Sequence, residues 1–288
     1  MAQTLNEIYL DMRRRLRAGG VEAYALEARL LLAKACGMDE NRMLANMHLY
    51  PSTKIIQEAN EYTARRLRGE PCAYILGTWE FYGMPMIVTP DVLIPRMDTE
   101  VLVNTALTAA KGKEAPLRIL DLCCGSGCIG CALAKHIPGS RVVLGDISPE
   151  ARAIARKNIL LNNLGRQAIC MEADALSPAP GNLGQYDLLV SNPPYITPQE
   201  ILTLDSSVKD WEPRLALDGG EDGLMFYRSI VFGWKSVLKD NGTLIFELGE
   251  GQSPAVKELM AQAGFINIGG CYDTLGVERV VYGTLTCK

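Results

Sequence analysis

From about residue 96 onward, short apolar segments alternate with stretches of helical spacing, and this alternation most restricts the possible fold. The apolar segments are LRILDLCC, RVVLGD, AICMEA, YDLLVS and TLIFELG, the last of them after a turn at Asn241-Gly242. A helix is expected after Gly127, and Ser148-Pro149 and Ser253-Pro254 are typical helix starts. Strands that alternate with helices predict an α/β protein with a parallel, doubly wound sheet covered on both faces.

Two further parts complete this fold. Residues 1–77 predict a small helical bundle, because apolar residues recur at helical spacing from Leu5 and Ser52 would cap a later helix. Residues 78–95 contain strand-forming residues interrupted by Gly83-Met84-Pro85, which is typical of a β-hairpin and here suggests a linker. The segment VERVVYGTL predicts a last strand at an antiparallel edge. We therefore expect three parts: a helical domain (1–77), a hairpin linker (78–95) and a sheet domain (96–288).

Composition excludes several classes of protein. No apolar run approaches the roughly 20 residues needed to cross a bilayer, and the first residues lack the pattern of a secretory signal. A cytoplasmic protein, not bound to a membrane, is therefore expected, with its nine cysteines as reduced thiols. A net charge of −4 argues against nucleic acid bound through its phosphates. Two histidines leave little material for a histidine-based metal site or a catalytic triad, and a monomer is expected.

A glycine-bearing turn follows the first predicted strand of the sheet. It reads DLCCGSG (Asp121 to Gly127), and Asp146 ends the next strand, where a carboxylate can accept hydrogen bonds from both ribose hydroxyls. Gly125 and Gly127 would let backbone N–H groups approach a ligand. Because Cys123 stands where a dinucleotide motif might have its first glycine, the turn suits a nucleoside without a pyrophosphate, such as S-adenosylmethionine. A tight turn with a purely structural aspartate is the alternative.

The cysteines around this turn raise the question of a metal site. Cys123 and Cys124 are adjacent residues at a strand end, so their side chains should point to opposite faces and cannot easily converge on one ion. Cys128 and Cys131 could share a helix face, but small buried apolar residues are the commoner use of such cysteines. We expect no metal, and zinc or redox chemistry remains the minority alternative.

The tetrapeptide Asn192-Pro193-Pro194-Tyr195 ends another predicted strand. Proline has no N–H, so Pro193 and Pro194 stop the sheet ladder and leave a stiff backbone whose carbonyls can face a ligand. Asn192 adds a side-chain acceptor and Tyr195 a flat ring. Together they suit a planar group that carries an –NH₂. The alternative is a rigid turn in which Tyr195 is simply packed.

At this point the sequence resembles the S-adenosylmethionine-dependent methyltransferases with a Rossmann-like fold, and among them the release-factor glutamine methyltransferases (the HemK/PrmC family). The resemblance covers nearly the whole chain. Its stretches are GEPCAYILGTWEFYG, VLIPRMDTEVLV, ILDLCCGSGCIG, DISPEA, SNPPYI, EPRLALDGGEDGL and FELGEGQ. The first two lie outside the generic methyltransferase motifs and therefore carry the specificity.

This resemblance implies methylation of the side-chain N5 of the glutamine in the Gly-Gly-Gln loop of class 1 peptide-chain release factors. It implies that residues 192–195 hold the glutamine and that the helical domain docks the release factor. The cofactor residues that it implies are Cys123, Cys124, Gly125, Ser126, Gly127, Asp146, Asp174, Ala175 and Asn192. The chain departs from the family where Cys123-Cys124 replace a frequent Gly-Thr and Ala175 an aromatic residue.

Several other polar residues lie near the predicted site or on helix surfaces. Arg96 and Glu100 could line the edge of the cofactor, or form a salt bridge between the hairpin and a helix. Glu247 could orient a backbone loop, Arg279 is interpreted as structural, and the run RRRLR as a solvated helix face.

Two other functions remain open. An N6-adenine nucleic-acid methyltransferase could use the same tetrapeptide on a flipped base, although the acidic balance of the chain argues against it. A non-catalytic nucleoside-binding protein is also conceivable, because a fold alone fixes no function.

Overall fold

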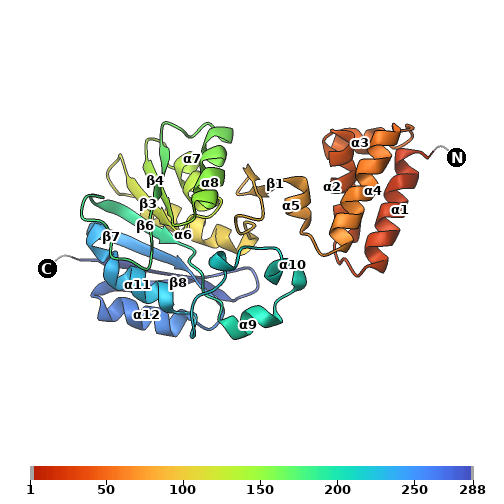
Figure 1. Cartoon of the computed structure of the whole chain (residues 1–288). Coiled ribbons are helices and arrows are strands. Elements are labelled where there is room, and N and C mark those ends of the chain that lie inside the picture. The colour runs from red at the N-terminus through yellow and green to blue at the C-terminus, as the bar shows by residue number, and fades with distance from the viewer. Residues whose placement is uncertain (1–2, 287–288) are drawn as a thin grey trace. The chain divides into compact units, whose positions relative to one another are not determined.

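The computed structural model describes residues 3–286, which form two compact units (Figure 1). The first unit extends to Thr78 and includes the distant segment Asp205–Trp211. The second comprises Trp79–Leu204 and the chain from Glu212 onward. That residues 205–211 belong to the first unit was not predicted from the sequence.

The first unit is a helical bundle, as predicted. Its helices are α1 (Leu5–Ala18), α2 (Tyr24–Cys36), α3 (Glu40–Ala45), α4 (Thr53–Leu67), α5 (Cys72–Leu76) and α10 (Ser206–Lys209). Leu16, Leu31 and Leu32 are completely buried in its core. The Ser52 hydroxyl caps α4 as expected. The sequence did not predict α3 and α5, because six and five residues are too few to establish a helical repeat.

The hairpin consists of β1 (Thr78–Phe81) and β2 (Met84–Ile87). Its turn is Tyr82-Gly83, where both residues have positive φ angles of 51° and 68°, so Met84 and Pro85 belong to the second strand and not to the interruption. Phe81, Met84 and Met86 are buried against the core of the second unit. From Trp79 onward the hairpin is therefore part of that unit.

The second unit contains the predicted sheet, with seven strands in the order β5-β4-β3-β6-β7-β9-β8. The parallel strands are β3 (Arg118–Leu122), β4 (Arg141–Asp146), β5 (Ala168–Glu172), β6 (Tyr186–Ser191) and β7 (Leu238–Glu247). β9 (Glu278–Leu285) runs antiparallel to β7, and β8 (Phe265–Tyr272) pairs antiparallel with β9. The predicted last strand, β9, is antiparallel but lies between β7 and β8. The prediction that it forms the edge was wrong, because β8 was missed.

Two details explain where the sequence was misleading. In β8, Gly269 and Gly270 weaken the strand pattern, but a Cβ on them would lie 2.5 Å and 1.7 Å from the side chains of Tyr282 and Glu278. A larger residue at either position would therefore require the Tyr282 or Glu278 side chain to move. The Asn241-Gly242 pair does not precede β7 but lies inside it, where Asn241 has a φ of 59° and the register with β6 shifts.

Helices cover both faces of the sheet (Figure 1). They are α6 (Glu100–Ala110), α7 (Cys128–His136), α8 (Pro149–Leu161), α11 (Met225–Gly233) and α12 (Ser253–Gln262). The short helix α9 (Pro198–Thr203) and the 3-10 turns η1 (Met97–Thr99), η2 (Arg214–Ala216) and η3 (Lys235–Val237) lie in the connections. Residues of α6, α7 and α8 share one apolar core with Ile119 and Leu188, and residues of α11 and α12 share another with Leu120 and Leu189. Neighbouring strand residues thus face opposite cores, as a doubly wound sheet requires.

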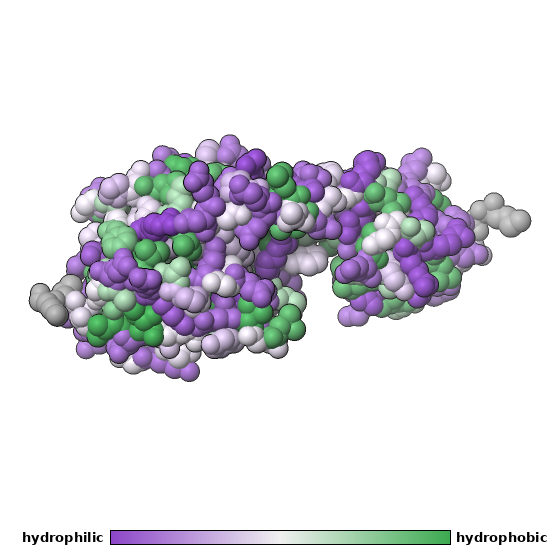
Figure 2. Space-filling model, turned by 90° about the horizontal axis from the view of Figure 1, so that it is seen from below, coloured by the Kyte–Doolittle hydropathy of each residue, from purple (hydrophilic) through white to green (hydrophobic). Residues whose placement is uncertain are grey.

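The surface carries no extended apolar band on the face shown in Figure 2, where hydrophilic residues are interspersed with small apolar groups. Leu202 and Leu275 are strongly exposed, at 75% and 84%, but single exposed apolar residues are normal. Within residues 3–286 there is no helix with the length and apolar character that membrane crossing demands.

Candidate active site

The candidate site lies at the carboxyl ends of β3, β4 and β6, where the strand order reverses. Leu122 pairs with both Gly145 of β4 and Ser191 of β6, so the next residues of all three strands meet there. They are Cys123, Asp146 and Asn192. A cavity of about 310 Å³ opens at this point, and all its walls belong to the second unit. Ligands of doubly wound sheets bind at such a switch point.

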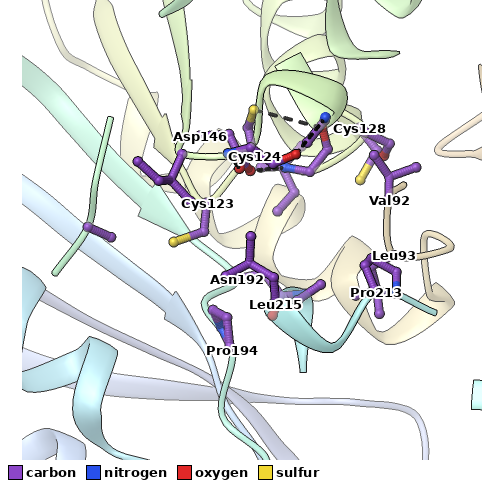
Figure 3. Close-up of a pocket in the computed structure, with 18 of the residues that line it drawn as sticks. Val92, Leu93, Cys123, Cys124, Cys128, Asp146, Asn192, Pro194, Pro213 and Leu215 are labelled. Carbon is purple, nitrogen blue, oxygen red and sulfur yellow. Dashed lines mark hydrogen bonds between the residues drawn. The ribbon is translucent and has the colours of Figure 1, made fainter. Parts of the chain in front are cut away.

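The glycine turn and Asp146 form one hydrogen-bonded wall of the cavity (Figure 3). Asp146 Oδ2 accepts from the Gly125 N–H at 2.8 Å, and Oδ1 accepts from the Ser148 N–H at 2.9 Å. Each oxygen keeps a further lone pair for a ligand. Burial raises the pKa of Asp146, and the hydrogen bond from Gly125 is the largest of the effects that oppose it. Asp146 is thus positioned by the turn before any ligand binds.

The two glycines of the turn have different roles. Gly125 has a φ of 52° and open space around the position of a Cβ, so it serves the backbone conformation and lines the cavity. Gly127 is not among the residues that line the cavity. A Cβ there would lie 2.6 Å from Leu144 and 3.1 Å from Ala155, so this glycine lets α7 start against β4 and α8.

Cys123, Cys124 and Cys128 line the cavity, whereas Cys131 is buried in the core. Burial raises the pKa of each of these thiols, for Cys128 to about 12, and Asp146 raises those of Cys123 and Cys124 further. They are therefore neutral at physiological pH. All eight described cysteines are free, and Cys287 lies outside the described residues. Within residues 3–286 no cluster of three or more potential ligands could hold a metal ion.

Asn192 and Pro194 form the wall that faces the glycine turn (Figure 3). The Asn192 Nδ2 donates to the Thr99 hydroxyl at 3.5 Å, and Thr99 also lines the cavity. Pro193 and Tyr195 are not lining residues: Pro193 is buried, and Tyr195 is half-buried against the core of α11 and α12. Burial, and next to it the charge of Glu247, raises the pKa of Tyr195 to about 12.

Tyr195 is enclosed by groups for which the sequence predicted no individual role. A Cβ on Gly219 would lie 2.6 Å from the Tyr195 Cα. The Tyr195 carbonyl accepts from Gln252 Nε2 at 2.9 Å, while Gln252 Oε1 accepts from the Gly249 N–H at 3.0 Å. Gln252, and not Ser253, is the N-cap residue of α12. One side chain thus joins the loops after β6 and β7.

The cavity also contains the predicted adenine side. Asp174 and Ala175 both line it. Asp174 is already engaged, because its carboxylate accepts from the Leu176 N–H at 2.9 Å and from the Ser177 hydroxyl at 2.7 Å. The Ala175 carbonyl accepts from the Ser229 hydroxyl at 2.7 Å.

Two buried polar residues, Glu212 and Asn158, hold together the segments around the cavity, and the sequence predicted no role for either. Glu212 binds the Arg96 guanidinium and accepts from the Ile94 N–H at 3.2 Å, whereas Glu100 accepts from the Tyr82 N–H at 3.1 Å. Arg96 thus lines the cavity as predicted, whereas Glu100 does not, and the alternative of a salt bridge between the hairpin and the helix was wrong. Asn158, completely buried, joins β2 to the glycine turn through Ile87 and the Ser126 carbonyl.

Glu247 is the last residue of β7, and Arg279 is the second residue of its antiparallel neighbour β9. Arg279 binds Asp273 at 2.9 Å and Asp98 at 3.5 Å, as a structural residue would. Glu247 is 3% exposed, and burial raises its pKa to about 7.

Comparisons with known proteins show the family of the chain. The chain matches the PrmC N-terminal domain over residues 7–77 and the methyltransferase small domain over residues 97–210. It is 41% identical to the release factor glutamine methyltransferase of Geobacter sulfurreducens, covering 92% of this chain and 91% of that relative. The namesake from Caulobacter vibrioides is 36% identical, with coverages of 98% and 97%.

A solved methyltransferase from Pyrococcus furiosus aligns with a TM-score of 0.52 at 16% identity, over 79% of this chain and 100% of that one. That likeness concerns the fold alone. The two sequence relatives cover almost the entire chain, including both compact units. The chain therefore belongs to the release factor glutamine methyltransferase family.

Proposed function

We propose that this protein transfers a methyl group from S-adenosylmethionine to the side-chain N5 of the glutamine in the Gly-Gly-Gln loop of class 1 release factors. The site of action would be the cytoplasm, where these factors work. The observation that carries the proposal is the Asn192 carboxamide, which lines one cavity together with Asp146 and the glycine turn. An acceptor for an amide N–H thus lies beside a nucleoside-type site.

The residues of the cavity suit S-adenosylmethionine. Asp146 keeps free lone pairs toward a ribose, and Ile129, Ile147 and Phe226 supply apolar walls for a planar base. The cofactor would also contact the glycine turn, including Cys123 and Cys124, and the stretch at Asp174-Ala175. When bound, it supplies a methyl group on a positively charged sulfur.

The tetrapeptide would orient the acceptor amide. An amide nitrogen is a poor nucleophile because its lone pair is delocalised into the carbonyl. Asn192 Oδ1 would accept one of its two N–H bonds at the cavity wall. Pro193 and Tyr195 do not line the cavity but adjoin the lining residues Asn192 and Pro194, so the Pro193 carbonyl would accept the second N–H bond and Tyr195 would pack against the amide from beyond this wall. Fixing the nitrogen in this way favours attack on the methyl group and removal of the N–H proton, and such orientation can contribute about 7–11 kcal/mol in good cases.

The decisive experiment is incubation with S-adenosylmethionine labelled in its methyl group. The acceptors are a purified class 1 release factor, the same factor with its Gly-Gly-Gln glutamine changed to alanine, and a mixture of DNA and RNA. We expect label in the unmodified factor and in neither of the others. Label in nucleic acid but not in the factor would support the N6-adenine alternative and refute the proposal.

A further inference from the structure

Glu247 is a buried acid beside the proposed acceptor site that the methyl-transfer scheme does not use. It ends β7, is 3% exposed, and does not line the cavity. Among the described residues, its Oε2 is fully buried and has no hydrogen-bond partner. Burying a carboxyl oxygen without a hydrogen-bond partner costs folding free energy, so its presence here calls for an explanation.

A short polar chain leads from Glu247 to the cavity. Asn192 Nδ2 donates to Thr99 Oγ1 at 3.5 Å, and both side chains line the cavity. The Thr99 and Asn192 side chains also lie near enough to the Glu247 carboxyl to lower its pKa, and the effect of Thr99 is the larger. Thr99 is only 2% exposed, so its hydroxyl has little access to water as an alternative hydrogen-bond partner.

We propose that Glu247 is a positioning residue that determines, through Thr99, which end of the Asn192 carboxamide faces the acceptor. This inference rests on the proposed function. A carboxylate can only accept, so it takes the Thr99 hydroxyl proton and leaves Thr99 Oγ1 to accept from Asn192 Nδ2. Asn192 Oδ1 then faces the cavity, which is the orientation that an acceptor –NH₂ needs.

Protonation of Glu247 reverses the direction of these hydrogen bonds. A neutral Glu247 can donate to Thr99 Oγ1, whose hydroxyl then turns to Asn192 and favours the carboxamide with its –NH₂ toward the cavity. The –NH₂ of Asn192 would then face the –NH₂ of the substrate glutamine, which would lose its hydrogen-bond acceptor. The charge on Glu247 thus decides whether Asn192 is competent.

The surroundings of Glu247 place this change near neutral pH. Burial raises its pKa to about 7, the nearby Thr99 side chain opposes the rise, Asp98 of η1 adds to it, and Arg279 of β9 opposes it. Three further titratable groups face Glu247: Tyr195, Tyr227 of α11 and Cys128 of α7, whose pKa values are all raised. They are neutral between pH 6 and 8, so Asp98 and Arg279 are the charged neighbours.

The test compares kcat for release-factor methylation between pH 5.5 and 8.5 in the full chain, Glu247→Gln and Glu247→Leu, with Glu258→Gln as an exposed control. For the unmodified chain we expect kcat to fall below pH 7, approaching tenfold per pH unit. Glu247→Gln keeps an acceptor oxygen but cannot titrate, so it should retain at least about a third of kcat at pH 8 without the acidic fall. Glu247→Leu should lose about tenfold or more at every pH, with S-adenosylmethionine affinity within about twofold.

Thr99 provides a second comparison that does not depend on how the Glu247 variants fold. Thr99→Ser keeps the hydroxyl and should resemble the unmodified chain, whereas Thr99→Val should lose kcat. An unchanged acidic fall in Glu247→Gln, or equal activity of Thr99→Ser and Thr99→Val, would overturn the inference. Failure of the proposed function would look different, because the unmodified chain would then not label the factor even at pH 8.

Discussion

At the scale of single residues, substitution of Asn192 should lower the rate of methyl transfer without weakening cofactor binding. Asn192→Ala removes the side-chain acceptor but leaves Asp146 and the glycine turn intact. We expect kcat to fall on the order of 10²-fold or more, as when one oriented polar partner is removed from an active site. The affinity for S-adenosylmethionine, measured by calorimetry, should change less than about threefold.

A matched control for this variant is Gln199→Ala, an exposed position in the nearby helix α9. It should leave both kcat and cofactor affinity unchanged. If Asn192→Ala kept full turnover, the acceptor role of the carboxamide would be wrong. If it lost cofactor affinity in proportion to kcat, the residue would serve the cofactor and not the acceptor.

The residue scale also shows what a sequence can predict about a site. Asp146 and Asn192 were predictable because both end parallel strands, and such ends share one edge of the sheet. Glu212 and Gln252 were not, since their partners lie 116 and 57 residues away along the chain. Cys123 has a φ of 61°, a conformation typical of glycine, at the position where we noted that a glycine was missing. The turn after β3 thus has a backbone conformation typical of glycine at position 123, although the residue there is a cysteine.

At the scale of elements, Gln252 is expected to hold three loops together. Its side chain contacts the carbonyls of Tyr195 and Gly223 and accepts from the Gly249 N–H and, at 3.3 Å, the Tyr227 hydroxyl. Gln252→Ala leaves several of these groups without a partner, which typically costs about 1–3 kcal/mol. Urea denaturation should show this decrease in the free energy of unfolding.

The comparison for this variant is Gln262→Ala at the other end of α12, where the side chain is exposed and, among the described residues, hydrogen-bonds only to Glu258, at 3.2 Å. It should stay within about 0.5 kcal/mol of the unmodified chain. Equal effects of the two substitutions would mean that the contacts of Gln252 add nothing to the packing of the loops.

Elements were predictable where local signals and tertiary packing agree. Ser148 does cap α8, and its hydroxyl accepts from the Ala151 N–H at 3.0 Å. By contrast, β8 was missed because two glycines interrupt its strand pattern, and their close contact with the Tyr282 and Glu278 side chains of β9 is visible in no local pattern. The hairpin was recognised as a hairpin, but its burial against the second unit depends on alternating Phe81, Met84 and Met86, which face a distant core.

At the scale of the whole molecule, a buried acid links stability to pH. Asp121 has no exposure, its Oδ2 accepts from the Gly130 N–H at 2.8 Å, and its Oδ1 has no partner among residues 3–286. Burial raises its pKa to about 8, and Asp146 adds to the rise against the hydrogen bond from Gly130. In the unfolded chain an aspartate titrates near 3.9.

Between about pH 4 and pH 8 the folded chain therefore holds a proton that the unfolded chain has released. The free energy of unfolding falls as pH rises through this window, by up to about 1.4 kcal/mol per pH unit for one proton. Glu247, with a pKa of about 7, acts in the same direction up to its own pKa. Carboxylates with a lowered pKa, such as Asp222, act below this window and do not cancel the effect.

Asp121→Asn tests this assignment, because asparagine keeps an acceptor for the Gly130 N–H but does not titrate. The free energy of unfolding, measured in urea at half-unit steps from pH 5 to 9, should decline less steeply in the variant than in the unmodified chain. The two curves should diverge up to about pH 8 and run parallel above it. Parallel curves throughout would mean that Asp121 is already ionised in the folded protein, and that the unpartnered oxygen carries a full negative charge inside the sheet.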